Sequence, residues 1–219
     1  MPGYYEKQPS VRVVIPVYNG APFIRSAIES VLAQSIEVTE CIVVNDGSKD
    51  ETEMLVSQYG DRVRLYSQNQ QGVAAARNRG IALSHGSHIA FLDADDVWLP
   101  SKIEAQLDTL RSCGADAVVC EITVTNQNLE WTDEESGTIG GDLRSLLKFE
   151  CSGGGGSTLL ATRNILGRVG GYHPDLSTSA DWDLLAQIAL VGQIAVVEEP
   201  LVLYRKHESN MHRNVFVME

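Results

Sequence analysis

Short runs of β-branched residues alternate with helical patterns through the first half of the chain. Arg12 to Val17 reads RVVIPV, a run typical of a strand that is buried on both faces. After the turn signal Asn19-Gly20, apolar residues recur at helical spacing from Ile24 to Leu32 and form one stripe. This pattern predicts a first strand followed by a helix that packs against it.

The alternation continues through three further units. Ser48 with Glu51, and Ser101 with Glu104, have the spacing of a capping box, so each pair predicts the start of a helix. Alternating strands and helices predict a parallel sheet flanked by helices, with the loops after the strands at one edge. The predicted elements are a strand at Cys41 to Val44, a helix from Ser48 toward Tyr59, a strand at Val63 to Tyr66, a helix at Val73 to Leu83, a strand at Ile89 to Leu92 and a helix after Pro100.

The second half of the chain is less regular. Gly153 to Gly156 can be read as a domain linker, but a strand-like run follows at once, which favours a mobile loop near a site. We therefore expect one domain over residues 1–219. The predicted elements are a strand at Ala117 to Val124, a loop at Asn126 to Gly141, a short helix at Leu143 to Phe149, a strand at Ser157 to Ala161, a helix at Asp181 to Leu190, and strands at Ile194 to Val197 and Leu201 to Tyr204.

Composition narrows the class of protein. With 43% apolar and 21% charged residues, the 219-residue chain has the composition of a globular domain. A formal net charge of −12 argues against nucleic-acid binding; the excess acid is either a solubility device or gathered around a cation that carries phosphate. Four cysteines without a CxxC pair, and no leader pattern, predict reduced thiols in the cytoplasm. No apolar run approaches the ~18 residues of a membrane helix.

The sequence Asp93-Ala94-Asp95-Asp96, directly after a predicted strand, carries the most chemical information. Three carboxylates in four residues repel one another, and a divalent cation such as Mg²⁺ or Mn²⁺ would neutralise them. Asp95 is the favoured ligand, whereas Asp96 is either a ligand or a cap on the backbone. His207 is either a surface residue or, beside Arg205 and Lys206, part of an anion site. Neither GxGxxG nor a P-loop motif is present.

Taken together, the motifs of the chain resemble those of inverting family 2 glycosyltransferases of the GT-A fold. The resemblance runs from Val11 to His207, and its order and spacing make it specific, although each segment alone would be weak. The matching segments are VVIPVYNG (Val13 to Gly20), VVNDGSKDET (Val43 to Thr52), QGVAAARNRGI (Gln71 to Ile81), FLDADDVWLP (Phe91 to Pro100), GGY (Gly170 to Tyr172), ADWDLLAQIA (Ala180 to Ala189) and YRKH (Tyr204 to His207).

The resemblance implies a role for each matching residue. Asp181 would be the catalytic base, and Asp95 with His207 would hold Mn²⁺ or Mg²⁺ on the diphosphate of the donor. Tyr18 would pack against the base of the nucleoside and Asp46 would accept a hydrogen bond from it. The full set of residues implied to bind the donor is Pro16, Tyr18, Asp46, Arg77, Asp93 and Ala94.

The resemblance also implies an activity. The chain would move a sugar from a nucleoside-diphosphate sugar to an acceptor hydroxyl, with inversion at the anomeric carbon. Residues 1–110 would bind the donor and residues 111–219 the acceptor. A UDP-sugar is the default donor, with guanosine and thymidine carriers left open. The acceptor would be a carbohydrate or a lipid-linked molecule in cell-surface polysaccharide or glycoconjugate synthesis, and the protein would be cytoplasmic, with peripheral contact at the inner membrane face left open.

Some features of the sequence leave alternatives open. Ala180 stands where the family usually has Glu, which leaves Asp181 as the base with altered acceptor binding, as a mere helix cap, or in a binding protein without turnover. The end of the chain at Glu219, before helices that family members often carry, is compatible with the last reading. Asp183 lies about 200° around a helix from Asp181 and is expected to face elsewhere. The run Asp93-x-Asp95 also fits the nucleophile motif of haloacid-dehalogenase-like phosphatases, although those enzymes carry it on their first strand.

Overall fold

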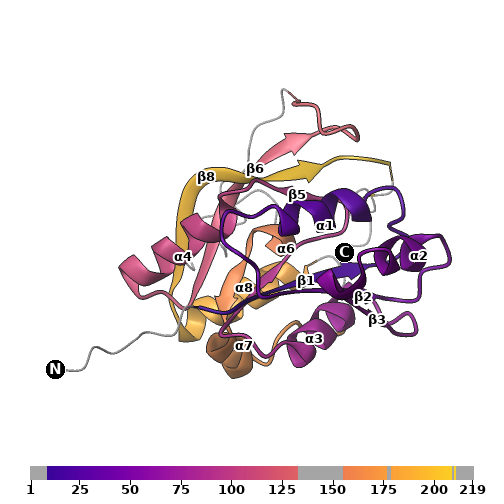
Figure 1. Ribbon diagram of the computed structural model, residues 1–219. Helices are drawn as coiled ribbons and strands as arrows, with labels where there is room; N and C mark the ends of the chain where they lie inside the picture. Colours follow the sequence, from indigo (N-terminus) through magenta and orange to yellow (C-terminus); the bar gives the residue numbers. More distant parts are fainter. Residues whose placement is uncertain (1–8, 133–154, 177–178, 209, 211–219) are drawn as a thin grey trace.

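One curved sheet forms the centre of the molecule. The computed structural model describes residues 9–132, 155–176, 179–208 and 210. Eight strands lie in the order β3-β2-β1-β4-β7-β6-β8-β5, and the sheet curls toward the long strands β6 and β8 (Figure 1). Four of the seven strand pairings among the described residues are parallel. The mostly parallel sheet flanked by helices that the sequence predicts is therefore confirmed.

The first half of the chain builds four adjacent parallel strands. Helix α3 has the bounds that the sequence predicts, and the strands agree with the prediction to within one or two residues. The centre of β1 is enclosed by its neighbours, since Val14 lies opposite Ile42 on one side and Phe91 on the other. The elements are β1 (Val11–Val17), α1 (Ile24–Leu32), β2 (Glu40–Asn45), α2 (Thr52–Ser57), the 3₁₀ turn η1 (Gly60–Arg62), β3 (Val63–Ser67), α3 (Val73–Leu83) and β4 (His88–Phe91).

The second half continues the same sheet with strands of mixed direction. Strand β7 runs antiparallel between β4 and β6, and β8 pairs with β6 in parallel across an irregular register near Glu121. The elements are β5 (Val97–Trp98), α4 (Lys102–Cys113), β6 (Ala117–Thr125), α6 (Gly155–Thr158), β7 (Leu160–Thr162), α7 (Arg163–Val169), α8 (Ala180–Val191) and β8 (Ile194–Arg205).

Helices cover both faces of the sheet, and a cluster of buried apolar residues lies between the sheet and the helices on each face. The first apolar cluster lies under α1, α2 and α4, and the second lies under α3, α7 and α8. Helices α1, α2 and α4 pack on one face, with Ile28 of α1 and Leu107 of α4 fully buried there. Helices α3, α7 and α8 pack on the other, around Phe91 and Leu184 (Figure 1). Because both faces are covered, the strands read as continuous apolar runs instead of alternating ones.

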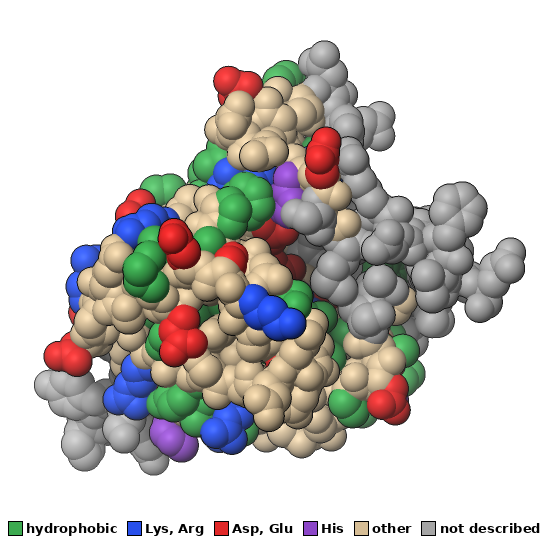
Figure 2. Space-filling model, turned by 90° about the vertical axis from the view of Figure 1, so that its right-hand side faces the viewer, with side chains coloured by type: hydrophobic (Ala, Val, Ile, Leu, Met, Phe, Trp, Pro, Cys, Tyr) green, Lys and Arg blue, Asp and Glu red, His purple; other side chains and the backbone are tan. Residues whose placement is uncertain are grey.

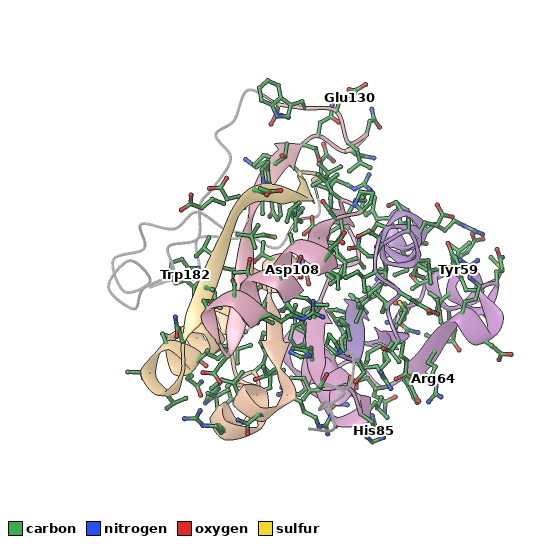
Figure 3. All side chains as sticks on the ribbon, turned by 60° about the vertical axis from the view of Figure 1, so that its left-hand side comes forward. Tyr59, Arg64, His85, Asp108, Glu130 and Trp182 are labelled. Carbon is green, nitrogen blue, oxygen red and sulfur yellow. The ribbon has the colours of Figure 1, made fainter. Side chains whose placement is uncertain are left out.

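The two halves take up opposite ends of the strand order in the sheet. In Figure 3, Tyr59 and Arg64 mark the end that the first half builds, and Trp182 on α8 marks the other. Strands β1 and β4 stand between them, and β4 joins the halves through its antiparallel pairing with β7. Residues after the carboxyl end of β4 can therefore meet residues from both halves.

Neither predicted capping box forms its side-chain bonds, although the predicted start of a helix at Ser101 is confirmed. Helix α2 begins at Thr52, four residues after Ser48, whose hydroxyl instead accepts a hydrogen bond from the amide of Asn19. It also ends at Ser57, short of Tyr59. Helix α4 does begin after Ser101, but that residue makes no side-chain cap bond, and Glu104 accepts from the Ser35 hydroxyl. Long-range partners for these side chains override the local pattern.

The second half departs further from the prediction. The run predicted as a strand from Ser157 begins later, because Ser157 and Thr158 end the helical turn α6 and β7 starts at Leu160. Gly155 and Gly156 belong to that turn, so the described part of the glycine run is helical and not a loop. The two late strands are one strand, β8, that passes through Pro200. Strand β5 and helix α7 were not predicted.

Some predictions fall outside the described residues. These are the helix at Leu143 to Phe149, the part of the polar loop after residue 132, and Gly153 and Gly154. Among the described cysteines, Cys41, Cys113 and Cys120 are free thiols. In the part of the chain that the structure describes, no helix combines the length and apolar character needed to cross a bilayer.

Candidate active site

The candidate site lies at the carboxyl ends of β1, β2 and β4, where parallel sheets bind ligands. The second half of the chain adds residues from α6, α8 and the end of β8. In the face that Figure 2 shows, acidic side chains gather in a recess beside a histidine. The site thus combines segments that are far apart in the sequence, as in the bond from Arg205 Nε to the carbonyl of Asp95, 110 residues away.

Asp46 follows β2 and is almost fully buried. Its Oδ1 accepts hydrogen bonds from Gln68 Nε2 at 2.8 Å and from the Gln71 amide at 2.9 Å, and Oδ2 accepts from the Gly72 amide at 2.7 Å. Among the described residues these bonds take three of the roughly four lone-pair positions of the carboxylate. Asp46 therefore fixes the turn before α3, and its contact with a nucleoside base stays a prediction.

The other donor residues implied near β1 differ in exposure. Tyr18 is 43% exposed at the end of the strand, so its ring is available to a planar ligand. Pro16 is buried within β1, opposite Val44. Ala94 is partly buried beside the first apolar cluster, close to Gly20. The structure brings these residues to one edge, and their roles stay predictions.

Asp96 is a structural residue and does not cap a helix. It is buried and accepts hydrogen bonds from the Ser157 hydroxyl at 2.5 Å and from the Arg205 amide at 3.0 Å. Burial, with the nearby charges of Asp95 and Asp93, raises the pKa of Asp96 well above its usual value. The next helix begins only at Lys102, so Asp96 instead ties the loop after β4 to α6 and β8.

Asp95 faces His207 directly. The Nε2 atom of His207 lies 2.9 Å from Oδ2 of Asp95, and Asn210 Nδ2 lies 3.4 Å from the same oxygen. The imidazole is 7% exposed and packs against the ring of Phe23, with 4.5 Å between centroids. Two residues 112 positions apart are therefore brought together, as the resemblance implies.

The pair Asp95 and His207 fits two neighbouring ligands of one cation. Two ligands about 2.1 Å from an octahedral ion stand about 3 Å apart, which agrees with the 2.9 Å between the two atoms. An imidazole with a carboxylate suits Mn²⁺ better than Mg²⁺. In residues 9–132, 155–176, 179–208 and 210, no group of three or more His, Cys, Asp or Glu is arranged to hold a metal. A cation here would need further ligands from the substrate.

Arg77 joins the two remaining carboxylates. Its Nη2 lies 2.6 Å from Oδ1 of Asp93, and its Nη1 lies 2.8 Å from Oδ1 of Asp181. Burial opposes the charge of Arg77, but the carboxylates of Asp181 and Asp93 outweigh burial and raise the pKa of Arg77. The guanidinium is therefore a permanent cation between the two acids. Its contact with a nucleotide, which the resemblance implies, stays a prediction.

Asp181 lies near the start of α8 and does not act as its cap. The helix begins at Ala180, and the N-cap position Ser179 makes no side-chain cap bond. Asp181 is 24% exposed and reaches across to Arg77. Asp183 bonds Gln187 along the same helix at 2.5 Å, as expected of a residue that faces elsewhere. Ala180, in the place where a Glu is usual, is buried in the second apolar cluster.

Arg205 is a buried residue that holds the loop of Asp95 in place, and its guanidinium is not exposed to bind an anion. It is 6% exposed, and it donates to the carbonyls of Asp95 and Gln127 and to the Ser26 hydroxyl. Its guanidinium also lies 4.9 Å from the centre of the Phe23 ring. The position of Arg205 two residues before His207 indicates that it lies near the site. Its hydrogen-bond partners could not be predicted, because they are far away in the sequence.

A buried polar network under α6 was missed entirely. Trp98 Nε1 donates to the carbonyl of Ser157 at 2.8 Å, and Gln106 Nε2 donates to that of Thr158 at 2.7 Å. Lys102, fully buried in α4, donates to Gln106 Oε1 at 2.7 Å, with its ammonium 4.0 Å from the centre of the Trp98 ring. Burial lowers the pKa of Lys102 to about 8. The spacing of four residues between Lys102 and Gln106 is a local signal from which this pair could have been predicted.

Comparisons with known proteins show the family and the fold of the chain. The family model described as glycosyl transferase family 2 matches residues 12–166. An uncharacterized glycosyltransferase of Rickettsia felis is 34% identical over 94% of this chain and 36% of its own length, and one of Rickettsia prowazekii, RP339, is 35% identical over 91% and 64%. The putative teichuronic acid biosynthesis glycosyltransferase TuaG of Bacillus subtilis is 38% identical over 48% of this chain and 44% of its own length. The chain thus spans from about a third to two thirds of the length of these relatives.

A solved structure gives the fold. The crystal structure of S. aureus TarS 1-349 in complex with UDP-GlcNAc matches with a TM-score of 0.75 over 92% of this chain and 60% of that one, at 18% identity. At this identity the likeness concerns the fold alone, and it confirms the GT-A fold.

Proposed function

The chain belongs to glycosyltransferase family 2, and on that premise we propose that it transfers a sugar from a nucleoside-diphosphate sugar to an acceptor hydroxyl, with inversion of the anomeric carbon. The observation that carries this proposal is the shared guanidinium of Arg77, which binds Asp93 after β4 and Asp181 on α8. An acid at the donor edge and an acid on the opposite half of the chain thereby belong to one site.

Asp181 acts as the general base. A sugar hydroxyl is a poor nucleophile, and a positioned carboxylate that takes its proton contributes on the order of 10²- to 10⁴-fold. The hydroxyl oxygen attacks the anomeric carbon, its proton moves to Asp181, and the bond from that carbon to the diphosphate oxygen breaks. One displacement without a protein nucleophile inverts the configuration. The partial exposure of Asp181 supports this role, since an acceptor can reach it.

Asp95 and His207 hold a divalent cation, Mn²⁺ or Mg²⁺. The 2.9 Å between their ligand atoms supports the pair as neighbouring ligands. When bound, the cation stabilises the negative charge that develops on the leaving nucleoside diphosphate. Arg205 and Phe23 keep the pair in place from the protein side.

The donor is a UDP-sugar, and the acceptor is a carbohydrate or lipid-linked molecule of the cell surface. TarS, which shares the fold, was crystallised in complex with UDP-GlcNAc, and this makes uridine nucleotides the first donors to test. The name of TuaG, with its teichuronic acid, supports a surface polymer as the product. Tyr18, with its exposed ring at the end of β1, supports binding of a base there.

Two measurements test the proposal. In a thermal-shift screen of UDP-glucose, UDP-GlcNAc, GDP-mannose and dTDP-glucose with and without Mn²⁺, we expect the largest rise in Tm with a uridine donor and Mn²⁺ together. The stabilising donor is then incubated with carbohydrate acceptors, and the anomeric configuration of the product is read by NMR. No Tm shift with any nucleotide sugar would overturn the donor assignment, and a product of retained configuration would overturn the single displacement.

A binding protein without turnover is the second candidate. Ala180, buried where the family usually has Glu, is the observation that favours it. This candidate predicts donor binding with no release of nucleoside diphosphate in the presence of any acceptor. The phosphatase alternative has no support, since Asp93 follows the fourth strand and the chain belongs to a glycosyltransferase family.

A further inference from the structure

Arg77 is held more rigidly than a surface arginine. It is 3% exposed, and its two terminal nitrogens bind two different carboxylates at 2.6 and 2.8 Å. The guanidinium lies 5.0 Å from the centre of the Tyr172 ring. Because a guanidinium is planar and its donors have fixed directions, two such bonds fix where both acids stand relative to each other.

The surroundings leave Arg77 no room to move. A Cβ atom at Gly156 would clash with Arg77 Nη2 and would lie 2.7 Å from Asp93 Oδ2, so the bare backbone of α6 closes against this pair. On the other side, Asn78 exchanges two hydrogen bonds with the backbone of Tyr172, at 2.7 and 2.8 Å. Two consecutive residues of α3 therefore fasten the first half of the chain to the second.

We propose that Arg77 is a positioning residue that sets the distance between the donor edge at Asp93 and the base Asp181, and not a ligand of the nucleotide. This inference rests on the proposed function. The donor meets Asp93, which is 32% exposed, whereas Arg77 lies behind it and acts through the two acids. Displacement of a catalytic group by about 1 Å can lower the rate on the order of 10²-fold. Because the two terminal nitrogens of Arg77 form a planar fork that holds both acids in place, this fork controls the rate of transfer.

Arg77→Lys tests the inference, because lysine keeps the charge but has no fork. We expect kcat for transfer to fall about 100-fold, with donor KM and the Kd of donor with Mn²⁺ within about threefold of the wild type. The matched control is Arg79→Lys, an exposed arginine on the same helix, which is expected to keep both constants. A rise in donor Kd of about tenfold or more with kcat retained would make Arg77 a nucleotide ligand and overturn the inference.

A double-mutant cycle separates positioning from general support of the fold. If Arg77 acts through Asp181, Arg77→Lys combined with Asp181→Asn is no slower than Asp181→Asn alone. Additive losses would overturn the inference. Wild-type turnover is measured in the same series, so its absence would count against the proposed function, whereas unchanged kcat in Arg77→Lys would count against the positioning role alone.

Gly156→Ala supplies a second variant in case Arg77→Lys does not fold. The added methyl group presses on Nη2 without removing any charge. We expect kcat to fall at least about tenfold with donor Kd unchanged. A Gly156→Ala variant with wild-type kcat would contradict the inference.

Discussion

The two halves of the sheet differ in how their sequence relates to their role. Strands β3, β2, β1 and β4 are all parallel, and each is followed by a loop at the same edge. Strands β7, β6, β8 and β5 are mixed in direction, with an irregular register between β6 and β8. On the proposed function, the regular half provides the edge that binds the donor, whereas the irregular half provides the base Asp181, the histidine His207 and buried residues that support that edge.

The difference shows that the site is completed across the sheet. Asp93 and Asp95 come from the loop after β4, but both are linked to residues of the second half. Asp95 contacts His207 directly, and Asp93 is linked to Asp181 through Arg77, which binds both carboxylates. On the proposed function, a change at Asp181 in the second half should remove transfer while donor binding persists, whereas a change at His207 should weaken the metal-dependent part of donor binding.

The largest effect is expected at Asp181. Asp181→Asn removes the base but keeps a side chain of the same shape, so kcat should fall by about 10²- to 10⁴-fold with the Tm shift by donor and Mn²⁺ unchanged. Asp183→Asn, two residues along the same helix and bonded to Gln187, is the control and should keep wild-type turnover. Equal losses in the two variants would show that the helix, not the base, had been disturbed.

His207 tests the metal pair. His207→Ala removes one of two neighbouring ligands, so the Mn²⁺ concentration that gives half of the donor-dependent rise in Tm should increase at least about tenfold. His85→Ala, at an exposed histidine that precedes β4 whereas the site follows that strand (His85 is labelled in Figure 3), should leave that concentration unchanged. Chelation of the metal with EDTA should abolish the rise in the wild type. A donor response that is indifferent to both EDTA and His207→Ala would contradict the cation site.

Ser157 tests the contact between the two halves, since it belongs to α6 and bonds the loop after β4. Its hydroxyl accepts a hydrogen bond from the Asp93 amide at 3.0 Å and donates one to the buried carboxylate of Asp96, so Ser157→Ala leaves each of these groups short of a partner. The free energy of unfolding should fall by about 1 to 2 kcal/mol in urea titrations. Ser112→Ala on the exposed side of α4 is the control and should change it by less than about 0.5 kcal/mol. If the free energy of unfolding fell less in Ser157→Ala than in Ser112→Ala, the hydrogen bonds of Ser157 would not stabilise the contact between the halves.

The effect at Lys102 depends on pH. Because burial lowers its pKa to about 8 from 10.5, the unfolded chain binds more protons than the folded protein between these values. The wild type should therefore gain stability relative to Lys102→Met as the pH rises from about 8 to 10.5, whereas below about pH 8 the difference should be constant. Urea titrations at about pH 7, 8, 9 and 10 measure it. A difference that is the same at every pH would place the ammonium in a solvated environment.

The sequence predicted the first half well because local patterns determine it. The apolar stripe of α1 follows from its spacing, the Ala-rich run from Val73 to Leu83 predicts α3, and the buried strands follow from β-branched runs. The site edge was predictable for the same reason, since polar residues after parallel strands must meet. The pairing of Asp95 with His207 came from the family resemblance and was then found in the structure.

The rest depended on partners far away in the sequence. Ser48 and Glu104 look like cap residues but bond other segments, so their helices begin differently or lack the expected cap. Asp96 looks like its neighbours in the acidic run, and only its burial by α6 and β8 makes it structural. The bare backbone of Gly156 against Arg77 carries no local signal at all.

The tether around Asp96 has a consequence for biosynthesis. Asp96 bonds Ser157 and Arg205, which emerge from the ribosome 61 and 109 residues later. A nascent chain can pair its first four strands while these partners are still untranslated, since domains fold as the N-terminal segments appear. On the proposed function, transfer of the sugar therefore waits until β8 has been made, because only then does Asp96 have both of these partners.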